Sequence, residues 1–229
     1  MPSRLQRASP TPPGKRAGGH DATERSVIAA VVLAAGQSRR MGRPKLLLPL
    51  AGRSVVRRVV ENARGSACGE IVVVVGEAED RIAAEVRGPL VRLVVNGRSR
   101  EGMGTSLAAG IAALPAGCEA AVVLLGDQPC VDAGAINALI DAHRRTGKPI
   151  IASRYGAVTG APTLLGRALF DEARDLTGDV GGRFLIERHP DLVAEVSLPP
   201  LAAADLDTPD DFARLKERVE GDPPRTGGG

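Results

Sequence analysis

The chain has few aromatic residues and few cysteines. Only 2% of its 229 residues are aromatic, with no tryptophan, one tyrosine and three phenylalanines. Rings this sparse exclude a stacking platform for single-stranded nucleic acid. The three cysteines (Cys68, Cys118 and Cys130) form no C-x-x-C pair, which fits neither a disulfide framework nor a zinc site. A reducing cytoplasm is therefore the expected location.

Long hydrophobic runs and an excess of charge in the body of the chain are also lacking. No apolar run approaches the roughly 18 residues of a membrane-spanning helix. The formal net charge is +3, and the five basic and two acidic residues among the first 25 account for all of it. The rest of the chain is balanced and presents no basic face for nucleic acid. Neither nucleic acid nor a membrane is an expected partner.

The composition of the remainder is that of a globular domain, with 43% hydrophobic and 25% charged residues. The N-terminal segment lacks the apolar stretch of a secretory signal and is rich in proline, glycine and arginine. We expect a disordered tail over residues 1–26, one domain over residues 27–220, and a flexible tail over residues 221–229.

Within the domain, short β-branched runs alternate with longer amphipathic segments. The strand runs are almost continuously apolar, which is typical of parallel strands buried on both faces. The pattern predicts an α/β fold in which helices cover both faces of a parallel sheet. The predicted strands are 27–33, 71–75, 91–95, 120–125, 149–153 and 193–198. The predicted helices are 54–64, 78–86, 105–114, 132–146, 166–174, 182–188 and 209–219.

The loop after the first strand has the composition of an anion site. Small residues at 34–36 allow close approach of backbone N–H groups to a ligand, and four basic residues follow within seven positions: Arg39, Arg40, Arg43 and Lys45. The loop does not match the P-loop, the dinucleotide fingerprint or the nucleophile elbow. A solvated basic turn is the alternative, but the position directly after a buried strand favours an anion.

Two acidic motifs are candidates for a metal site. Asp127 in GDQP follows a buried strand, so it is expected at the same edge of the sheet as the basic loop. Asp207 in DLDT precedes the last helix and is preferred to Asp205 as a second ligand. Mg²⁺ takes one or two protein carboxylates and completes its shell with phosphate and water. The alternatives are an ordinary turn before proline and an ordinary helix-capping segment around Thr208.

Taken together, these motifs resemble the MobA/MocA-type nucleotidyltransferases, which join a nucleotide to molybdopterin. Residues 33–45, LAAGQSRRMGRPK, match the family pattern L-A-[AG]-G-x-S-x-R-M-G-x-x-K. The remaining motifs follow in the family's order: VVVVG, Asn96, EGMGTSL, GDQP, TGDVGGR and DLDTPDDF. The resemblance extends over about residues 27–216. It implies a Rossmann-like three-layer nucleotidyltransferase fold with a mostly parallel central sheet.

The resemblance also implies an activity, which is transfer of a nucleoside monophosphate from a nucleoside triphosphate with release of pyrophosphate, with Mg²⁺ as cofactor. The implied catalytic residues are Arg40, Lys45 and Asp127, and the implied metal ligands are Asp127 and Asp207. The implied nucleotide-binding residues are Leu33, Ala34, Ala35, Gly36, Ser38, Arg39, Arg40, Lys45, Asn96, Ser106 and Asp127. The implied acceptor-binding residues are Gly160, Pro162, Gly178, Asp179 and Arg183.

The nucleotide and the acceptor are separate questions. Ala35, the GDQP segment and Pro44 before Lys45 resemble the branch that uses CTP. The sequence departs from the family at GRSR (97–100), GAP (160–162) and GGR (181–183), mostly in the acceptor half. The implied partners are CTP, a molybdopterin-type acceptor, and a molybdoenzyme or its chaperone. Two alternatives stay open: another phosphorylated acceptor such as a sugar phosphate, and a non-catalytic module that binds and delivers a nucleotide or cofactor.

Overall fold

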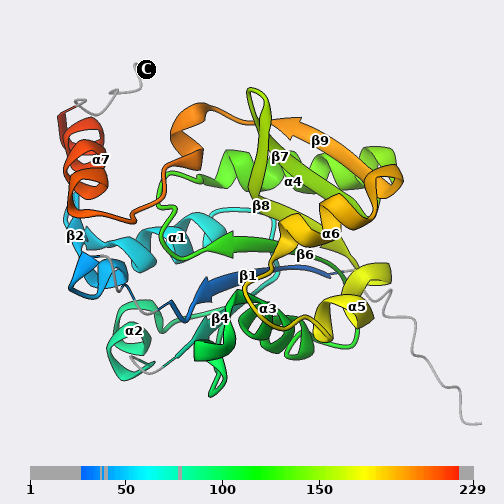
Figure 1. Ribbon diagram of the computed structural model, residues 1–229, viewed down its shortest axis with the longest axis horizontal. Coiled ribbons are helices and arrows are strands. Elements are labelled where there is room, and N and C mark those ends of the chain that lie inside the picture. The colour runs from blue at the N-terminus through cyan, green and yellow to red at the C-terminus, as the bar shows by residue number, and fades with distance from the viewer. Residues whose placement is uncertain (1–26, 37, 39–40, 77–78, 222–229) are drawn as a thin grey trace, which may run out of the picture.

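A seven-stranded sheet forms the centre of the molecule. The computed structural model describes residues 27–221 except 37, 39–40 and 77–78. The strand order is β5-β4-β1-β6-β8-β7-β9, and every pairing is parallel except the two made by β8 (Figure 1). The strands are β1 Val27–Ala34, β4 Glu70–Val75, β5 Val91–Val95, β6 Cys118–Leu125, β7 Ile150–Tyr155, β8 Val158–Gly166 and β9 Val193–Ser197. The predicted α/β fold with a mostly parallel sheet is confirmed.

Helices cover both faces of this sheet and complete three layers. One face carries α1 Val55–Arg64, α2 Glu79–Val86 and α4 Ala133–Thr146. The other carries α3 Met103–Ala112, α5 Phe170–Arg174 and α6 Gly182–Arg188. Single 3-10 turns are Lys45–Leu47, Ser99–Glu101, Arg167–Leu169, Pro190–Leu192 and Pro200–Ala203. None of the helices in the described part of the chain is both long and apolar enough to cross a bilayer.

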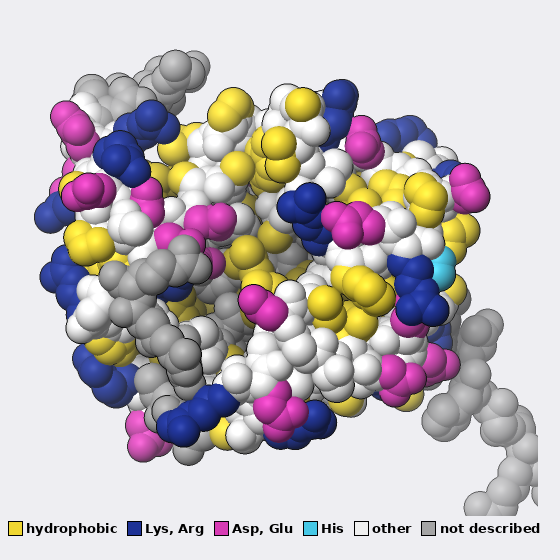
Figure 2. All heavy atoms as spheres, in the orientation of Figure 1, with side chains coloured by type: hydrophobic (Ala, Val, Ile, Leu, Met, Phe, Trp, Pro, Cys, Tyr) yellow, Lys and Arg dark blue, Asp and Glu magenta, His cyan; other side chains and the backbone are white. Residues whose placement is uncertain are grey.

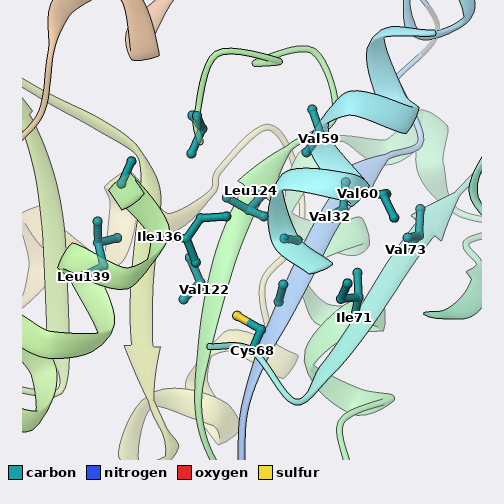
Figure 3. Close-up of a cluster of buried hydrophobic side chains, with 14 of the residues drawn as sticks. Val32, Val59, Val60, Cys68, Ile71, Val73, Val122, Leu124, Ile136 and Leu139 are labelled. Carbon is teal, nitrogen blue, oxygen red and sulfur yellow. The ribbon is translucent and has the colours of Figure 1, made fainter. Parts of the chain in front are cut away.

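Two hydrophobic cores, one on each face, hold the layers together. The apolar runs of β1, β4 and β6 send alternate side chains to the two faces, so each strand contributes to both cores. Figure 3 shows the core under α1 and α4, where Val32 and Leu124 from the sheet lie near Val60 and Ile136 from the helices. This double burial explains why the strands read as nearly unbroken apolar segments.

The last helix packs away from the sheet. Helix α7, Pro209–Gly221, buries Phe212 and Leu215 in a third cluster with Leu206, Leu50 and Met41. Leu50 belongs to a two-stranded ribbon of β2 Pro49–Leu50 and β3 Arg53–Ser54. This cluster therefore ties the end of the chain to the segment that follows β1. In Figure 1 the arrows of β1 and β6 point toward the side of the molecule where α7 and β2 lie.

The sequence-based prediction missed β8. Residues 158–165 were not predicted to be a strand, and Gly166 was predicted to begin a helix, but it is the last residue of β8. The segment contains Gly160 and Pro162, which weaken the strand signal. The helix predicted for 166–174 is a 3-10 turn followed by the five residues of α5. Helix α7 ends at Gly221, one residue beyond the expected domain end. The tails lie outside the described residues.

Substitution of Ile136 by alanine tests the first core. Ile136 is fully buried in α4, so truncation leaves a cavity that the packed layers cannot fill. We expect the free energy of unfolding to fall by about 2–5 kcal/mol. Urea denaturation measures it. Val158→Ala is the control, because Val158 is 60% exposed and should change stability by less than about 0.5 kcal/mol. Equal losses in the two variants would contradict this assignment of the core.

Candidate functional site

The structure brings one cation and two carboxylates together at the carboxyl end of the sheet. Lys45 Nζ lies 2.5 Å from Asp127 Oδ2 and 3.0 Å from Asp207 Oδ1. The side chains of Lys45 and Asp127 are 14% and 16% exposed, and that of Asp207 is 43% exposed. These three residues, the Lys45 cluster, come from segments separated by up to 162 residues. The side chains of Lys45 and Asp127 are thus mostly shielded from solvent, and that of Asp207 is the most exposed of the three.

Parallel pairing of β1 with β6 explains why two of these segments meet. Leu33 near the end of β1 pairs with Leu125 at the end of β6, so the loops after both strands begin side by side. The Gly126 N–H donates to the Leu33 carbonyl at 2.9 Å, and a Cβ at Gly126 would lie 3.0 Å from that oxygen. Asp127 follows at once. The next turn is held from α1, where the Asn62 carboxamide donates to the carbonyls of Pro129 and Val131.

The loop after β1 returns Lys45 to this edge through a local contact. The Lys45 N–H donates to Ser38 Oγ at 3.1 Å, which closes the loop across seven residues. Leu46 is buried in the core under α1, and Met41 is buried in the cluster under α7. Apolar side chains therefore anchor the middle of the loop at Met41 and the residue after it at Leu46, while the Lys45 side chain contacts the acids.

Asp207 is fixed by the start of α7. The Thr208 N–H donates to Asp211 Oδ2 at 2.8 Å, and the Asp211 N–H donates to Thr208 Oγ1 at 3.2 Å. This reciprocal pair has the form of a capping box, which satisfies N–H groups at a helix start. Thr208 thus caps α7, and Asp207 is the residue directly before the cap. The capping and the ion pair act on neighbouring residues.

A third carboxylate stands beside the cluster. Asp205 Oδ1 accepts a hydrogen bond of 2.7 Å from Gln128 Nε2. Desolvation raises the pKa of the Asp205 carboxyl, and the charges of Asp127 and Asp207 raise it further, against the Gln128 hydrogen bond and Lys45. Burial would lower the pKa of Lys45, but the charge and hydrogen bond of Asp127, followed by those of Asp207, outweigh it and raise the pKa. The ammonium is thus held in its charged form.

The residues expected to bind nucleotide lie in two places. Leu33 and Ala34 end β1, Ala35 is buried, and Gly36 is exposed with nothing within 4 Å of where a Cβ would stand. Arg39 and Arg40 lie outside the described residues. Asn96 follows β5 and is buried. Its Nδ2 donates to Thr105 Oγ1 and Ser106 Oγ, each at 2.9 Å, and its Oδ1 accepts from the Arg98 N–H. Asn96 and Ser106 therefore lie together and bond to each other.

The residues expected to bind the acceptor lie along β8 and before α6. Gly160 and Pro162 are on β8, whereas Gly178 and Asp179 precede α6 and Arg183 lies within it, paired with Glu187 at 2.8 Å. The start of α6 lies close to β8, because a Cβ added at Gly182 would lie 3.2 Å from the Thr163 side chain. The Gly104 N–H of α3 donates to the Gly178 carbonyl at 2.9 Å. The segment before α6 is thus attached to α3, which carries Ser106.

Two side chains from β7 support β8 and were not singled out by sequence reasoning. Ser153 Oγ donates to the Pro162 carbonyl at 2.6 Å, and the Tyr155 hydroxyl donates to the Ala161 carbonyl at 2.8 Å. Desolvation raises the pKa of Tyr155 to about 12, so the hydroxyl stays protonated and remains a donor. The sequence analysis did not predict β8, so it could not indicate that Ser153 and Tyr155 bond to that strand.

The donor set suits a hard divalent cation. Asp127 and Asp207 already contact one positive group, the Lys45 ammonium, from two sides. Two carboxylates are what Mg²⁺ ordinarily takes from protein when phosphates and water supply the rest. Within the described ranges no three His, Cys, Asp or Glu side chains form a group that could hold a metal by themselves. These carboxylates could therefore hold an ion shared with a phosphorylated ligand.

One face of the molecule has a hollow. Figure 2 shows acidic side chains gathered beside a hollow in the face that it presents. A separate cavity of about 220 Å³ lies next to α7, lined by Ala204, Asp205, Asp211, Arg214, Leu215 and Arg218. Asp205 thus lines this cavity as well as binding Gln128. The cavity is mixed in charge and is not lined by any member of the Lys45 cluster.

The model of one known family matches most of the chain. The model described as the MobA-like NTP transferase domain matches residues 30–193, which include Lys45 and Asp127. The chain belongs to this family of nucleotidyltransferases. The resemblance read from the motifs is confirmed, and the match covers most of the described residues. Asp207 and α7 lie beyond the matched range.

Curated relatives have different names. Nicotine blue oxidoreductase of Paenarthrobacter nicotinovorans is 31% identical over 203 residues, covering 84% of this chain and 98% of that protein. The bifunctional protein GlmU of Leifsonia xyli subsp. xyli is 38% identical over 148 residues, covering 59% of this chain. This chain spans only 30% of that GlmU protein.

Solved structures are similar to this chain in both fold and sequence. Rv0371c of Mycobacterium tuberculosis H37Rv has a TM-score of 0.75 and 31% identity, covering 84% of this chain and 98% of that one. A complex of Rv0371c with manganese has a TM-score of 0.70 and 29% identity over similar shares. A divalent cation thus binds a structural neighbour of this chain.

Substitution of Gly102 by alanine tests the contact between α3 and the segment before α6. A Cβ at Gly102 would lie 2.2 Å from the Gly178 carbonyl group, and Gly102 has a φ of +116°. We expect a loss of about 1–3 kcal/mol in the free energy of unfolding. Chemical denaturation measures it. The matched control is Gly97→Ala, where a new Cβ meets nothing within 4 Å. A tolerated Gly102→Ala would show that the two backbones are not in contact.

Proposed function

We propose that this chain is a Mg²⁺-dependent nucleotidyltransferase that transfers CMP from CTP to molybdopterin and releases pyrophosphate. The supporting observation is the Lys45 cluster, in which an ammonium group contacts two carboxylates at the end of the sheet. A nucleoside triphosphate needs positive charge against its phosphates, and a metal ion needs carboxylate ligands. The cluster contains both kinds of group within one ion-pair network.

The proposed reaction requires little acid–base catalysis by the protein. An oxygen of the acceptor's phosphate attacks the α-phosphorus, the bond from that phosphorus to the β-phosphate oxygen breaks, and pyrophosphate leaves. A phosphate nucleophile is already ionised, so rate depends on positioning and on neutralising charge. Mg²⁺, held by Asp127 and Asp207, would polarise the phosphate oxygens. Lys45 would neutralise the triphosphate, as would Arg40, which lies outside the described residues.

The remaining assignments follow the same proposal. The backbone at Ala34, Ala35 and Gly36 would approach the nucleotide, where Gly36 is exposed and has no close neighbour. The carboxamide of Asn96 is already bonded to Ser106 and Thr105. We therefore propose that Asn96 contributes to the nucleotide site by holding these two hydroxyl groups in place. Gly160, Pro162, Gly178, Asp179 and Arg183 would hold the acceptor. A molybdoenzyme or its chaperone would receive the product in the cytoplasm.

Replacement of Asp127 by asparagine tests the chemistry. The change removes one anionic ligand but keeps the size of the side chain, so Mg²⁺ and the triphosphate lose part of their support. We expect pyrophosphate release with CTP and molybdopterin to fall by about 100-fold or more, with the melting temperature nearly unchanged. Asp141→Asn is the control, because Asp141 is exposed on α4. Normal turnover by the Asp127 variant would remove the proposed metal role.

A panel of nucleotides and acceptors tests the substrates. Pyrophosphate release is measured with each nucleoside triphosphate and Mg²⁺, with molybdopterin, with sugar phosphates, and without acceptor. We expect CTP with molybdopterin to be preferred over GTP by at least about tenfold, a ratio within reach of a few altered contacts. Release with GTP alone would contradict the base assignment, and release with a sugar phosphate alone would contradict the acceptor. Nucleotide binding with no release under any condition would favour a delivery module.

A further inference from the structure

One hydrogen bond joins the two segments that carry the acidic residues of the cluster. Gln128 Nε2 donates to Asp205 Oδ1 at 2.7 Å, across 77 residues of sequence. Gln128 directly follows Asp127 in the turn after β6, and Asp205 stands two residues before Asp207. The bond thus joins the same two segments that Lys45 joins through its ion pairs with Asp127 and Asp207. Neither Gln128 nor Asp205 has a part in the reaction proposed above.

Gln128 is an unfavourable residue for packing alone. It is 4% exposed, and within the part of the chain that the structure describes its Oε1 atom has no hydrogen-bond partner. A buried carbonyl oxygen without a donor loses its hydration and gains nothing in return. An apolar side chain of the same size would fill this space without that penalty. Among the described residues, the side-chain amide of Gln128 makes one hydrogen bond, from Nε2 to Asp205.

Each of the two segments has its own anchors, and they also meet where Cys130, two residues after Gln128, packs against the cluster under α7. The turn of Gln128 is attached to β1 through Gly126 and to α1 through Asn62. The segment of Asp205 is attached to the cluster under α7, where Leu206 is fully buried, and to the capping pair at Thr208. The Gln128 bond joins the two segments through a neutral donor, beside the Lys45 ion pairs and the packing of Cys130.

We propose that Gln128 is a positioning residue: through Asp205 it holds Asp207 at the distance from Asp127 at which one cation can contact both carboxylates. This inference rests on the proposed metal site. Asp205 is an anchor for the segment in this arrangement and not itself a ligand. Its useful property is a hydrogen-bond acceptor at Oδ1, which does not require a negative charge.

The experiment measures Mn²⁺ affinity, not turnover. Free Mn²⁺ is followed by electron paramagnetic resonance during titration of the full chain in the presence of CTP. The variants are Gln128→Met, Asp205→Ala, Asp205→Asn and the double variant Gln128→Met/Asp205→Ala. Methionine keeps the size and flexibility of glutamine without the donor, and asparagine keeps the acceptor oxygen of aspartate without its charge.

We expect Gln128→Met and Asp205→Ala each to raise the Kd for Mn²⁺ by about 10-fold or more, the size usual for residues that support metal ligands. Asp205→Asn should stay near the wild-type Kd. The double variant should be no weaker than either single variant, because both remove the same link. The melting temperature of Gln128→Met should be unchanged within about 3 °C or higher than that of the wild type.

Four results would overturn the inference. Equal losses in Asp205→Asn and Asp205→Ala would make Asp205 a charged ligand. Wild-type Mn²⁺ affinity in Gln128→Met would show that the link has no effect, and a lower melting temperature would make Gln128 a packing residue. No Mn²⁺ binding by the wild type would remove the site itself. If the wild type binds Mn²⁺ but releases no pyrophosphate, the proposed function fails while the positioning inference stands.

Discussion

Parallel hydrogen bonding between β1 and β6 is the constraint on which the site depends. Because Leu33 is paired with Leu125, the chain leaves both strands at adjacent points of one edge. The loop after β1 leads to Lys45, and the turn after β6 contains Asp127. The basic loop and the acidic turn are therefore brought together by register, before any attraction between their charges. The ion pairs of Lys45 then fix the side chains within a geometry that the backbone has already set.

Much of this arrangement could be predicted from sequence for a simple reason. Strands buried on both faces must be apolar along their length, so the runs that became β1, β4 and β6 stand out clearly. Ligand-binding segments in such sheets follow the carboxyl ends of strands, so the position of a motif indicates its place in space. Lys45 and Asp127 were singled out on these grounds, and Asp207 by its acidic motif before the last helix. The Lys45 ammonium contacts both carboxylates.

Other features could not be predicted, because their signals are weak or distant. β8 contains Gly160 and Pro162, and it runs against its neighbours in a sheet whose other strands predict parallel pairing. The contact of Gln128 with Asp205 spans 77 residues, and neither motif contains a sign of the other. Asn96 was expected to bind nucleotide, and no motif indicated that its carboxamide bonds to Thr105, Ser106 and the Arg98 N–H. Composition does not reveal which polar groups satisfy each other.

The reversed direction of β8 has a consequence for how the site can vary. Val123 of β6 pairs with Thr163 of β8, so the beginning of β8 lies toward the same edge as the end of β6. The turn of the hairpin between Tyr155 and Val158 therefore lies on the same side of the sheet as the loops that follow the parallel strands. The hairpin can grow or shrink there by whole residue pairs without altering any parallel register. The hairpin can thus change in length while the parallel strands that lead into Lys45 and Asp127 keep their register.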